Sequence, residues 1–226
     1  MKSNEHAPKL FLFGDSIIDN KPYVGGRPTV TDEAKKLWPD EVTKHAEDGG
    51  VIRSVERQYE RAVAAGFRPD VDVMALSVMG NDLMGYTHVL RAPVTNVSEA
   101  MGTIYSTVAP IFQAYTQLVS QLRAAGVKHL VLTTIYPVYS MDRIGHQNEI
   151  ILGKPSAWIG MTPILGLVHR HIVDTAIAHG AQVADLFSGD FKPADIVLDI
   201  EPGPSASPKV ASIIVEAAKR CVGMMN

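Results

Sequence analysis

The feature that most constrains the fold of this chain is an alternation of short apolar segments with longer amphipathic ones. Short runs rich in β-forming residues predict strands, and apolar residues at helical spacing predict helices. This alternation is typical of βαβ units, whose helices cover both faces of a parallel sheet. We therefore expect a three-layer α/β/α sandwich with a five-stranded parallel sheet in flavodoxin-like order. The predicted strands are 9–13, 41–46, 72–77, 128–134 and 182–186, and the predicted helices are 31–37, 52–65, 97–125, 164–179 and 208–222.

Length and composition favour a single domain over residues 1–226. A single core can grow to about 250 residues, and the chain has 226, of which 46% are hydrophobic and 20% charged. No repeat, low-complexity tract or linker divides it. The segment 140–161, rich in Gly, Pro and polar residues, is predicted to be a long loop after the fourth strand.

Charge and cysteine content narrow the partners and the compartment. The formal net charge of -3 gives no electrostatic reason to bind nucleic acid or an anionic membrane. A lone cysteine, Cys221, cannot form an internal disulfide, which favours a reducing compartment. The sequence shows no signal peptide and no apolar run long enough to span a membrane. We expect a cytoplasmic protein, and a homo-oligomer stays open with no feature to support it.

Three polar or glycine-containing segments follow the first three predicted strands. In an open parallel sheet, ligands bind at the carboxyl ends of the strands. There Ser16 ends a Gly-Asp-Ser turn, Gly49 follows the second strand and Asn81 the third. The backbone N–H groups of Ser16 and Gly49 and the Asn81 amide can together form an oxyanion hole for acyl transfer. Gly-Asp-Ser alone is a common turn sequence, so the prediction depends on all three segments.

These segments, FGDSIIDN, HAEDGG and SVMGND, occur in the order and at the spacing found in the SGNH/GDSL hydrolases, which the chain resembles over nearly its whole length. The resemblance implies a flavodoxin-like fold and esterase or acylhydrolase chemistry without a cofactor. It also implies that Ser16 is the nucleophile and that Gly49 and Asn81 donate to the oxyanion. The substrate would be a small or medium acyl ester, whose acyl and leaving groups the sequence does not identify.

The sequence departs from the family pattern at two places. The glycine expected two residues before Asn81 is replaced by Met79, which we expect to narrow the pocket while leaving the amide donor intact. In the last motif, D-x-x-H-P, Glu201 replaces the histidine and Leu198 its aspartate partner. The resulting IEP sequence resembles that of a subgroup of the family, so we interpret Glu201 as the general base of a slow esterase.

Charged neighbours determine how good a base Glu201 can be. Burial raises the pKa of a carboxyl group, whereas a nearby cation lowers it. Arg53 is the one cation expected near these strand ends, where it can pair with Glu201, hold an anionic substrate group or simply face solvent. Asp195 and Asp199 are candidate assisting acids. The sequence leaves the outcome open.

We expect structural roles for most of the remaining titratable residues. None of the eight histidines lies in a substitute motif, and only His45 and His146 stay open as alternative bases. We expect Asp185 to bind loop backbone, and Asp15 and Asp19 to shape the turn around Ser16. No spacing of His, Cys or acidic residues indicates a metal site.

Two other functions compete with an esterase. One is a binding protein that keeps the hydrolase cleft but has lost efficient turnover along with the histidine. The other is a phosphate or FMN binder of the same fold class. The second is disfavoured because the loop after the first strand lacks the Gly, Ser and Thr run that would hold a phosphate.

Overall fold

The computed structural model describes residues 8–137, 155–198 and 200–224. Its centre is a parallel five-stranded sheet in the order β2-β1-β3-β4-β5, which confirms the predicted flavodoxin-like order. The strands are β1 (Leu10–Gly14), β2 (Val42–Lys44), β3 (Val73–Ser77), β4 (His129–Thr133) and β5 (Gln182–Ala184). β1 pairs with β2 on one side and with β3 on the other, so Ser16 follows a central strand.

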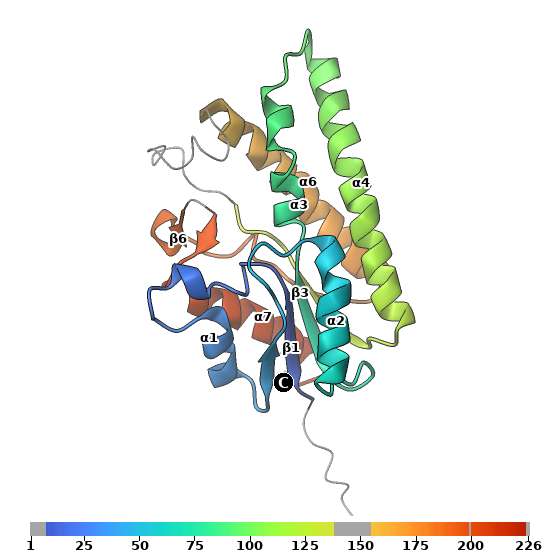
Figure 1. The fold of residues 1–226 in the computed structure, drawn as a ribbon, viewed down its shortest axis with the longest axis vertical. Helices are drawn as coiled ribbons and strands as arrows, with labels where there is room; N and C mark the ends of the chain where they lie inside the picture. The colour runs from blue at the N-terminus through green and yellow to red at the C-terminus, as the bar shows by residue number, and fades with distance from the viewer. Residues whose placement is uncertain (1–7, 138–154, 199, 225–226) are drawn as a thin grey trace, which may run out of the picture.

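Helices cover both faces of the sheet, as the sequence predicts (Figure 1). Successive residues of β1 point to opposite faces. Leu10 and Leu12 pack with α1 (Val30–Leu37) and α7 (Ser207–Cys221), whereas Phe11 and Phe13 face the core beneath α2, α4 and α6. The latter helices are α2 (Val55–Ala64), α4 (Val97–Ala124) and α6 (Pro155–Ala178). Because every residue of β1 is buried, the strand holds the turn that follows it in a fixed place.

A helical arm extends beyond the carboxyl edge of the sheet (Figure 1). It consists of α3 (Gly80–Met84), η3 (Thr87–Arg91) and the N-terminal half of α4, and α6 packs against it. The Asn96 side chain caps α4 by accepting a hydrogen bond from the Glu99 N–H at 2.9 Å. The arm starts directly after β3, next to the strand ends that the sequence marks as functional.

Several element boundaries differ from the predicted ones. The predicted helix 52–65 is divided into η2 (Ile52–Ser54) and α2, and the predicted strands 41–46 and 182–186 are three residues each. The predicted loop 140–161 is wrong from Pro155 onward, because α6 begins there. Proline fits the first turn of a helix, where its missing N–H has no intrahelical partner. The rest of that loop lies outside the described residues.

Several short elements were not predicted from the sequence. β6 (Ile196–Val197) pairs antiparallel with β7 (Glu201–Pro202), which forms a small hairpin after η4 (Pro193–Asp195). Another short helix, η1 (Lys21–Tyr23), follows the Ser16 turn. Within the described part of the chain, no helix is long and apolar enough to cross a membrane.

Candidate active site

The turn that carries Ser16 is fixed by contacts with β3. Gly14 has a φ of +127°, and a Cβ there would lie 1.7 Å from the Ser77 carbonyl oxygen, so only glycine fits. The buried Asp15 carboxylate accepts hydrogen bonds from the Ser77 hydroxyl at 3.0 Å and from the Ile17 N–H at 3.1 Å. The sequence-based expectation that Asp15 shapes this turn is thus confirmed.

Glu201 lies against Ser16 although the two are far apart in the chain. The Ser16 side chain interacts with the Glu201 carboxyl group, and this interaction favours the ionised form of the carboxyl group. Both side chains are buried, with Ser16 7% and Glu201 8% exposed. A hydroxyl and a carboxylate in this arrangement form the pair that general-base activation of a nucleophile requires.

The environment of Glu201 favours its protonated form. Burial raises the pKa of its carboxyl group to about 7, the negative charge of Asp48 adds to the rise, and the hydrogen bond from Ser16 opposes it. The Oε2 atom is buried and has no hydrogen-bond partner among the described residues. A carboxyl group with this pKa titrates in the range that suits a general base at neutral pH.

Asn20 joins the Ser16 turn to the Glu201 hairpin. Its side chain is fully buried, and its amide nitrogen donates to the Pro202 carbonyl at 3.0 Å and to the Ser207 hydroxyl at 2.8 Å. Its side-chain oxygen accepts the Val30 N–H at 2.9 Å, at the start of α1. Asn20 therefore fixes the residue next to Glu201 relative to the turn that carries Ser16.

The two glycines after β2 differ in their packing and in their hydrogen bonds. Gly50 lies against β1, where an added Cβ would be 2.3 Å from the Gly14 carbonyl oxygen. Gly49 is exposed, with a φ of +74°. Gly50 donates its N–H to the Glu47 carbonyl at 2.9 Å, whereas the Gly49 N–H has no hydrogen-bond partner within the described ranges. Of the two, Gly49 has the N–H available to a substrate.

Asn81 begins the helical arm and approaches the same loop. Its amide nitrogen donates to the Gly50 carbonyl at 2.9 Å, which leaves its second N–H for another acceptor. Met79, two residues earlier, has a φ of +101°, a left-handed conformation that glycine adopts without strain. The Met79 side chain is fully buried in the core. The glycine expected at this position would suit the backbone better, but methionine fills the core.

A second hydrogen-bonded pair lies beside Glu201. The Tyr23 hydroxyl is 3.0 Å from both carboxylate oxygens of Asp48, and the charge of Glu201 acts on Tyr23. The Asp48 N–H in turn donates to Asp19 at 3.2 Å, so Asp19, like Asp15, helps to shape this end of the sheet. Sequence reasoning missed Asn20, Tyr23 and Asp48 as site residues. Their only signal was their place inside or beside the segments that follow the strands.

The hydrogen bonds and ion pairs of several other candidates involve residues other than Ser16 and Glu201 in the described structure. The charge of Arg53 acts on Asp82, and no ion pair joins Arg53 to Glu201 among the described residues. Asp195 forms an ion pair with Lys209 at 2.7 Å, and it stabilises the hairpin. Asp199 lies outside the described residues.

The two histidines that the sequence left open do not form an alternative site in the described structure. His45 stacks on Phe11 and Phe13, with ring centroids 5.9 and 5.6 Å away, so its ring belongs to the core face of the sheet. Its burial lowers the pKa of the imidazole. His146 lies outside the described residues. Asp185 accepts the Ser188 N–H at 3.2 Å, which confirms its expected contact with loop backbone.

Metal ligands and sequence relatives offer no further guide. No group of three or more His, Cys, Asp or Glu side chains within residues 8–137, 155–198 and 200–224 is arranged to hold a metal ion. No protein-family model matches the sequence, and no curated protein matches it.

Three solved structures with the same fold are distant in sequence. A phospholipase A1 from Streptomyces albidoflavus NA297 is 14% identical, with a TM-score of 0.65 over 93% of this chain and 99% of that chain. A member of the lipolytic G-D-S-L family from Veillonella parvula DSM 2008 is also 14% identical, with a TM-score of 0.63 over 93% and 97%. A variant of an acetyl xylan esterase from Geobacillus stearothermophilus is 16% identical, with a TM-score of 0.58 over 97% and 96%.

Proposed function

Because the chain shares the fold of the SGNH/GDSL hydrolases, we propose that it is a serine hydrolase of carboxylic esters. Ser16 is the nucleophile and Glu201 the general base. The observation that carries the proposal is the buried Ser16 hydroxyl, which interacts with a buried carboxyl group whose pKa is raised to about 7. The substrate is a small-molecule ester.

The reaction proceeds through an acyl-enzyme. Glu201 accepts the Ser16 proton while the Ser16 Oγ attacks the ester carbonyl carbon, and the carbonyl oxygen becomes an oxyanion. The N–H groups of Ser16 and Gly49 and the second Asn81 N–H stabilise that charge. The intermediate collapses as Glu201 returns the proton to the departing alcohol. Water then attacks the acyl-enzyme while Glu201 takes its proton, and Glu201 returns that proton to the Ser16 Oγ as the bond between Oγ and the acyl carbon breaks and the carboxylic acid leaves.

The raised pKa sets the pH dependence of this reaction. Only the ionised carboxylate can accept a proton, so kcat/KM is expected to rise with pH through about 7 and then reach a plateau. This places the rise in the range where a histidine also titrates. The identity of the base therefore has to come from substitution of Glu201, because a pH profile alone does not distinguish the two groups.

A binding protein with little turnover is the second candidate function. Two observations favour it: Glu201 Oε2 has no partner among the described residues, and Leu198, at the position of the family's aspartate, has an exposed side chain. No group corresponding to the third member of a catalytic triad therefore orients the base in the described structure.

Replacing Ser16 with alanine tests both candidates. Ser16→Ala is expected to abolish hydrolysis of p-nitrophenyl acetate and labelling by a fluorophosphonate, because both need the hydroxyl. Ser106→Ala, which changes an exposed serine on α4, serves as the matched control and is expected to keep both. Hydrolysis by Ser16→Ala at the wild-type rate would contradict the proposal. Absence of both labelling and hydrolysis in the folded wild type would favour the binding protein, because only an activated serine reacts quickly with the fluorophosphonate.

A further inference from the structure

Gly49, the oxyanion donor from the loop after β2, is not held in place by packing. It has a φ of +74°, and a Cβ added there would meet no atom of the described residues within 4 Å, apart from its chain neighbours. Its neighbour Gly50, by contrast, lies against the Gly14 carbonyl of β1. An oxyanion donor is effective only when it is held in position before the reaction. The backbone at Gly49 therefore needs another contact to fix it.

The residue directly before Gly49 makes such contacts through its side chain and its backbone. The Tyr23 hydroxyl is 3.0 Å from both carboxylate oxygens of Asp48. The Asp48 N–H donates to an Asp19 carboxylate oxygen at 3.2 Å, and Asp19 forms an ion pair with Lys44. Asp48 is thus fixed on two sides, next to the Gly49 N–H.

Tyr23 is itself held by the segment that follows Ser16. Its N–H donates to the Asn20 carbonyl at 3.0 Å, and the Asn20 side chain is fully buried. Burial, the charge of Glu201 and the hydrogen bond to Asp48 raise the pKa of the Tyr23 hydroxyl, so it stays protonated and donates at neutral pH. Tyr23 therefore connects the turn after β1 to the loop after β2.

Asp48 keeps its negative charge because the partner that holds it is neutral. It forms no ion pair within the described ranges. Burial raises the pKa of Glu201 most, and the charge of Asp48 adds to that rise. Glu201 acts in turn on Asp15, Tyr23 and Tyr136. Asp48 thus has two separable effects, one on the position of the loop and one on the charge near the base.

We propose that Tyr23 is a positioning residue, which holds Asp48 and thereby the Gly49 N–H at the oxyanion, while Asp48 also places a negative charge near Glu201. The inference rests on the proposed function, because it requires an oxyanion at Gly49 and a base at Glu201. A contact that positions an oxyanion donor acts mainly in the transition state, so its loss changes kcat more than KM.

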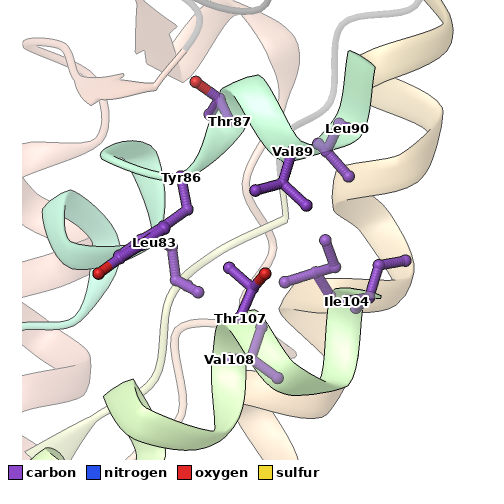
Figure 2. A pocket seen from close by; sticks show the side chains of 9 residues that line it. Leu83, Tyr86, Thr87, Val89, Leu90, Ile104, Thr107 and Val108 are labelled. Atoms are coloured by element: carbon purple, nitrogen blue, oxygen red, sulfur yellow. The ribbon is translucent and has the colours of Figure 1, made fainter. Parts of the chain in front are cut away.

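Deleting the Tyr23 hydroxyl tests the positional effect. Tyr23→Phe is expected to lower kcat for p-nitrophenyl acetate about tenfold and to change KM less than twofold, because a displaced donor loses part of the roughly hundredfold effect of an intact one. Tyr105→Phe is the matched control and should keep the wild-type kcat. Ile104 faces the small pocket of about 20 Å³ inside the arm (Figure 2), whereas Tyr105, the next residue of α4, is 73% exposed.

A double variant measures whether Tyr23 acts through Asp48. Asp48→Ala removes both the contact and the charge, so it is expected to lower kcat about tenfold and to move the rise of kcat/KM below pH 7. Adding Tyr23→Phe to Asp48→Ala should lower kcat less than twofold further, because the hydroxyl has already lost its acceptor. Additive losses would overturn the proposal, since Tyr23 would then act by another route.

Asp48→Asn separates position from charge. Its amide oxygen can still accept from Tyr23, so kcat on the plateau should fall less than in Asp48→Ala, while the rise of kcat/KM moves to lower pH because the charge is gone. An equal loss of kcat in the two variants, with the rise still near pH 7, would overturn the proposal.

The same measurements distinguish failure of this inference from failure of the proposed function. Equal kcat in folded Tyr23→Phe and the wild type would overturn the role of Tyr23 and leave the esterase intact. A folded wild type that neither hydrolyses p-nitrophenyl acetate nor reacts with a fluorophosphonate would contradict the esterase, and the role of Tyr23 with it.

Discussion

The two halves of the candidate site are held in place by different means. The nucleophile half comprises Ser16 in the turn after β1, Gly49 in the loop after β2, and Asn81 in helix α3 after β3. The base half is Glu201, on a strand of two residues in the β6–β7 hairpin. The first half is positioned by the hydrogen-bonded central sheet, and the second by side chains from other parts of the chain.

This difference shows which catalytic residue is positioned by the sheet and which is positioned by individual side chains. The turn of Ser16 follows a strand paired on both sides, so its position depends on many backbone contacts. Glu201 depends on the Asn20 amide at Pro202 and on the Tyr136 hydroxyl, which donates to the Ile200 carbonyl. Changes in the base half should therefore alter position and pKa together, whereas changes in the nucleophile half should alter individual catalytic steps.

Removing the charge of Glu201 should have the largest effect. Glu201→Gln is expected to lower kcat/KM about a thousandfold and to remove its rise near pH 7, because the amide cannot accept a proton. Glu216→Gln, an exposed change on α7, should leave both unchanged. If Glu201→Gln keeps near-native activity, the base lies elsewhere, and His45→Ala and His146→Ala then become the decisive variants.

Glu201→Gln, although it should lower activity, is expected to raise the stability of the folded protein above neutral pH. Because the folded-state pKa of Glu201 is raised, the folded protein holds the proton more tightly than the unfolded chain does. The wild type thus loses stability as pH rises from about 4.5 to about 7. Glu201→Gln avoids this loss and should be more stable than the wild type at pH 8, by on the order of 3 kcal/mol. Thermal unfolding at pH 4.5 and pH 8 measures the difference.

Removing a donor from the nucleophile half should have the next largest effect. Asn81→Ala is expected to lower kcat about a hundredfold with a smaller change in KM, because the donated hydrogen bond strengthens mainly in the transition state. Asn96→Ala, which removes the cap of α4, should reduce stability by about 1 kcal/mol without affecting kcat. A rise in KM at constant kcat in Asn81→Ala would assign the amide to substrate binding.

Loosening the connection between the halves should reduce stability and catalysis together. Asn20→Ala leaves the Val30 N–H and the Pro202 carbonyl without their buried partner, at a cost of about 3 kcal/mol. It should also shift the pH midpoint of kcat/KM, because Glu201 is no longer held at Ser16. Ser207→Ala removes the bond from Asn20 and a longer bond to the Gly203 carbonyl but keeps the bonds of Asn20 to Val30 and Pro202, so it should shift neither stability nor midpoint as far. An unchanged pH midpoint in folded Asn20→Ala would limit Asn20 to a structural role.

Sequence reasoning predicted the nucleophile half better than the base half, for a physical reason. Strand ends can be located from local patterns, and the rule for parallel sheets then brings Ser16, Gly49 and Asn81 to one edge. Ser16 and Asp48 act on Glu201, and Asn20 bonds its neighbour Pro202. All three lie more than 150 residues away in the chain, and no local pattern encodes these interactions. For the same reason, the sequence alone does not decide whether Arg53 pairs with Glu201, holds an anionic substrate group or faces solvent. The helical arm also escaped prediction in part, because α3 and η3 are too short for a periodic signal.

The smallest expected effect concerns Leu198, where the base half departs from the family pattern. Leu198 has a φ of +47°, a left-handed conformation that is unfavourable for leucine by about 1–2 kcal/mol and better tolerated by asparagine. Its side chain is 47% exposed, so little packing is lost on replacement. Leu198→Asn should therefore stabilise the protein by about 0.5–1 kcal/mol and leave kcat/KM unchanged.

Met79→Gly relieves similar backbone strain but removes a fully buried side chain, so it should destabilise the protein instead. A gain of stability in both variants would show that the Met79 side chain adds little to the core, and a loss of activity in Leu198→Asn would show that the exposed leucine contacts the substrate.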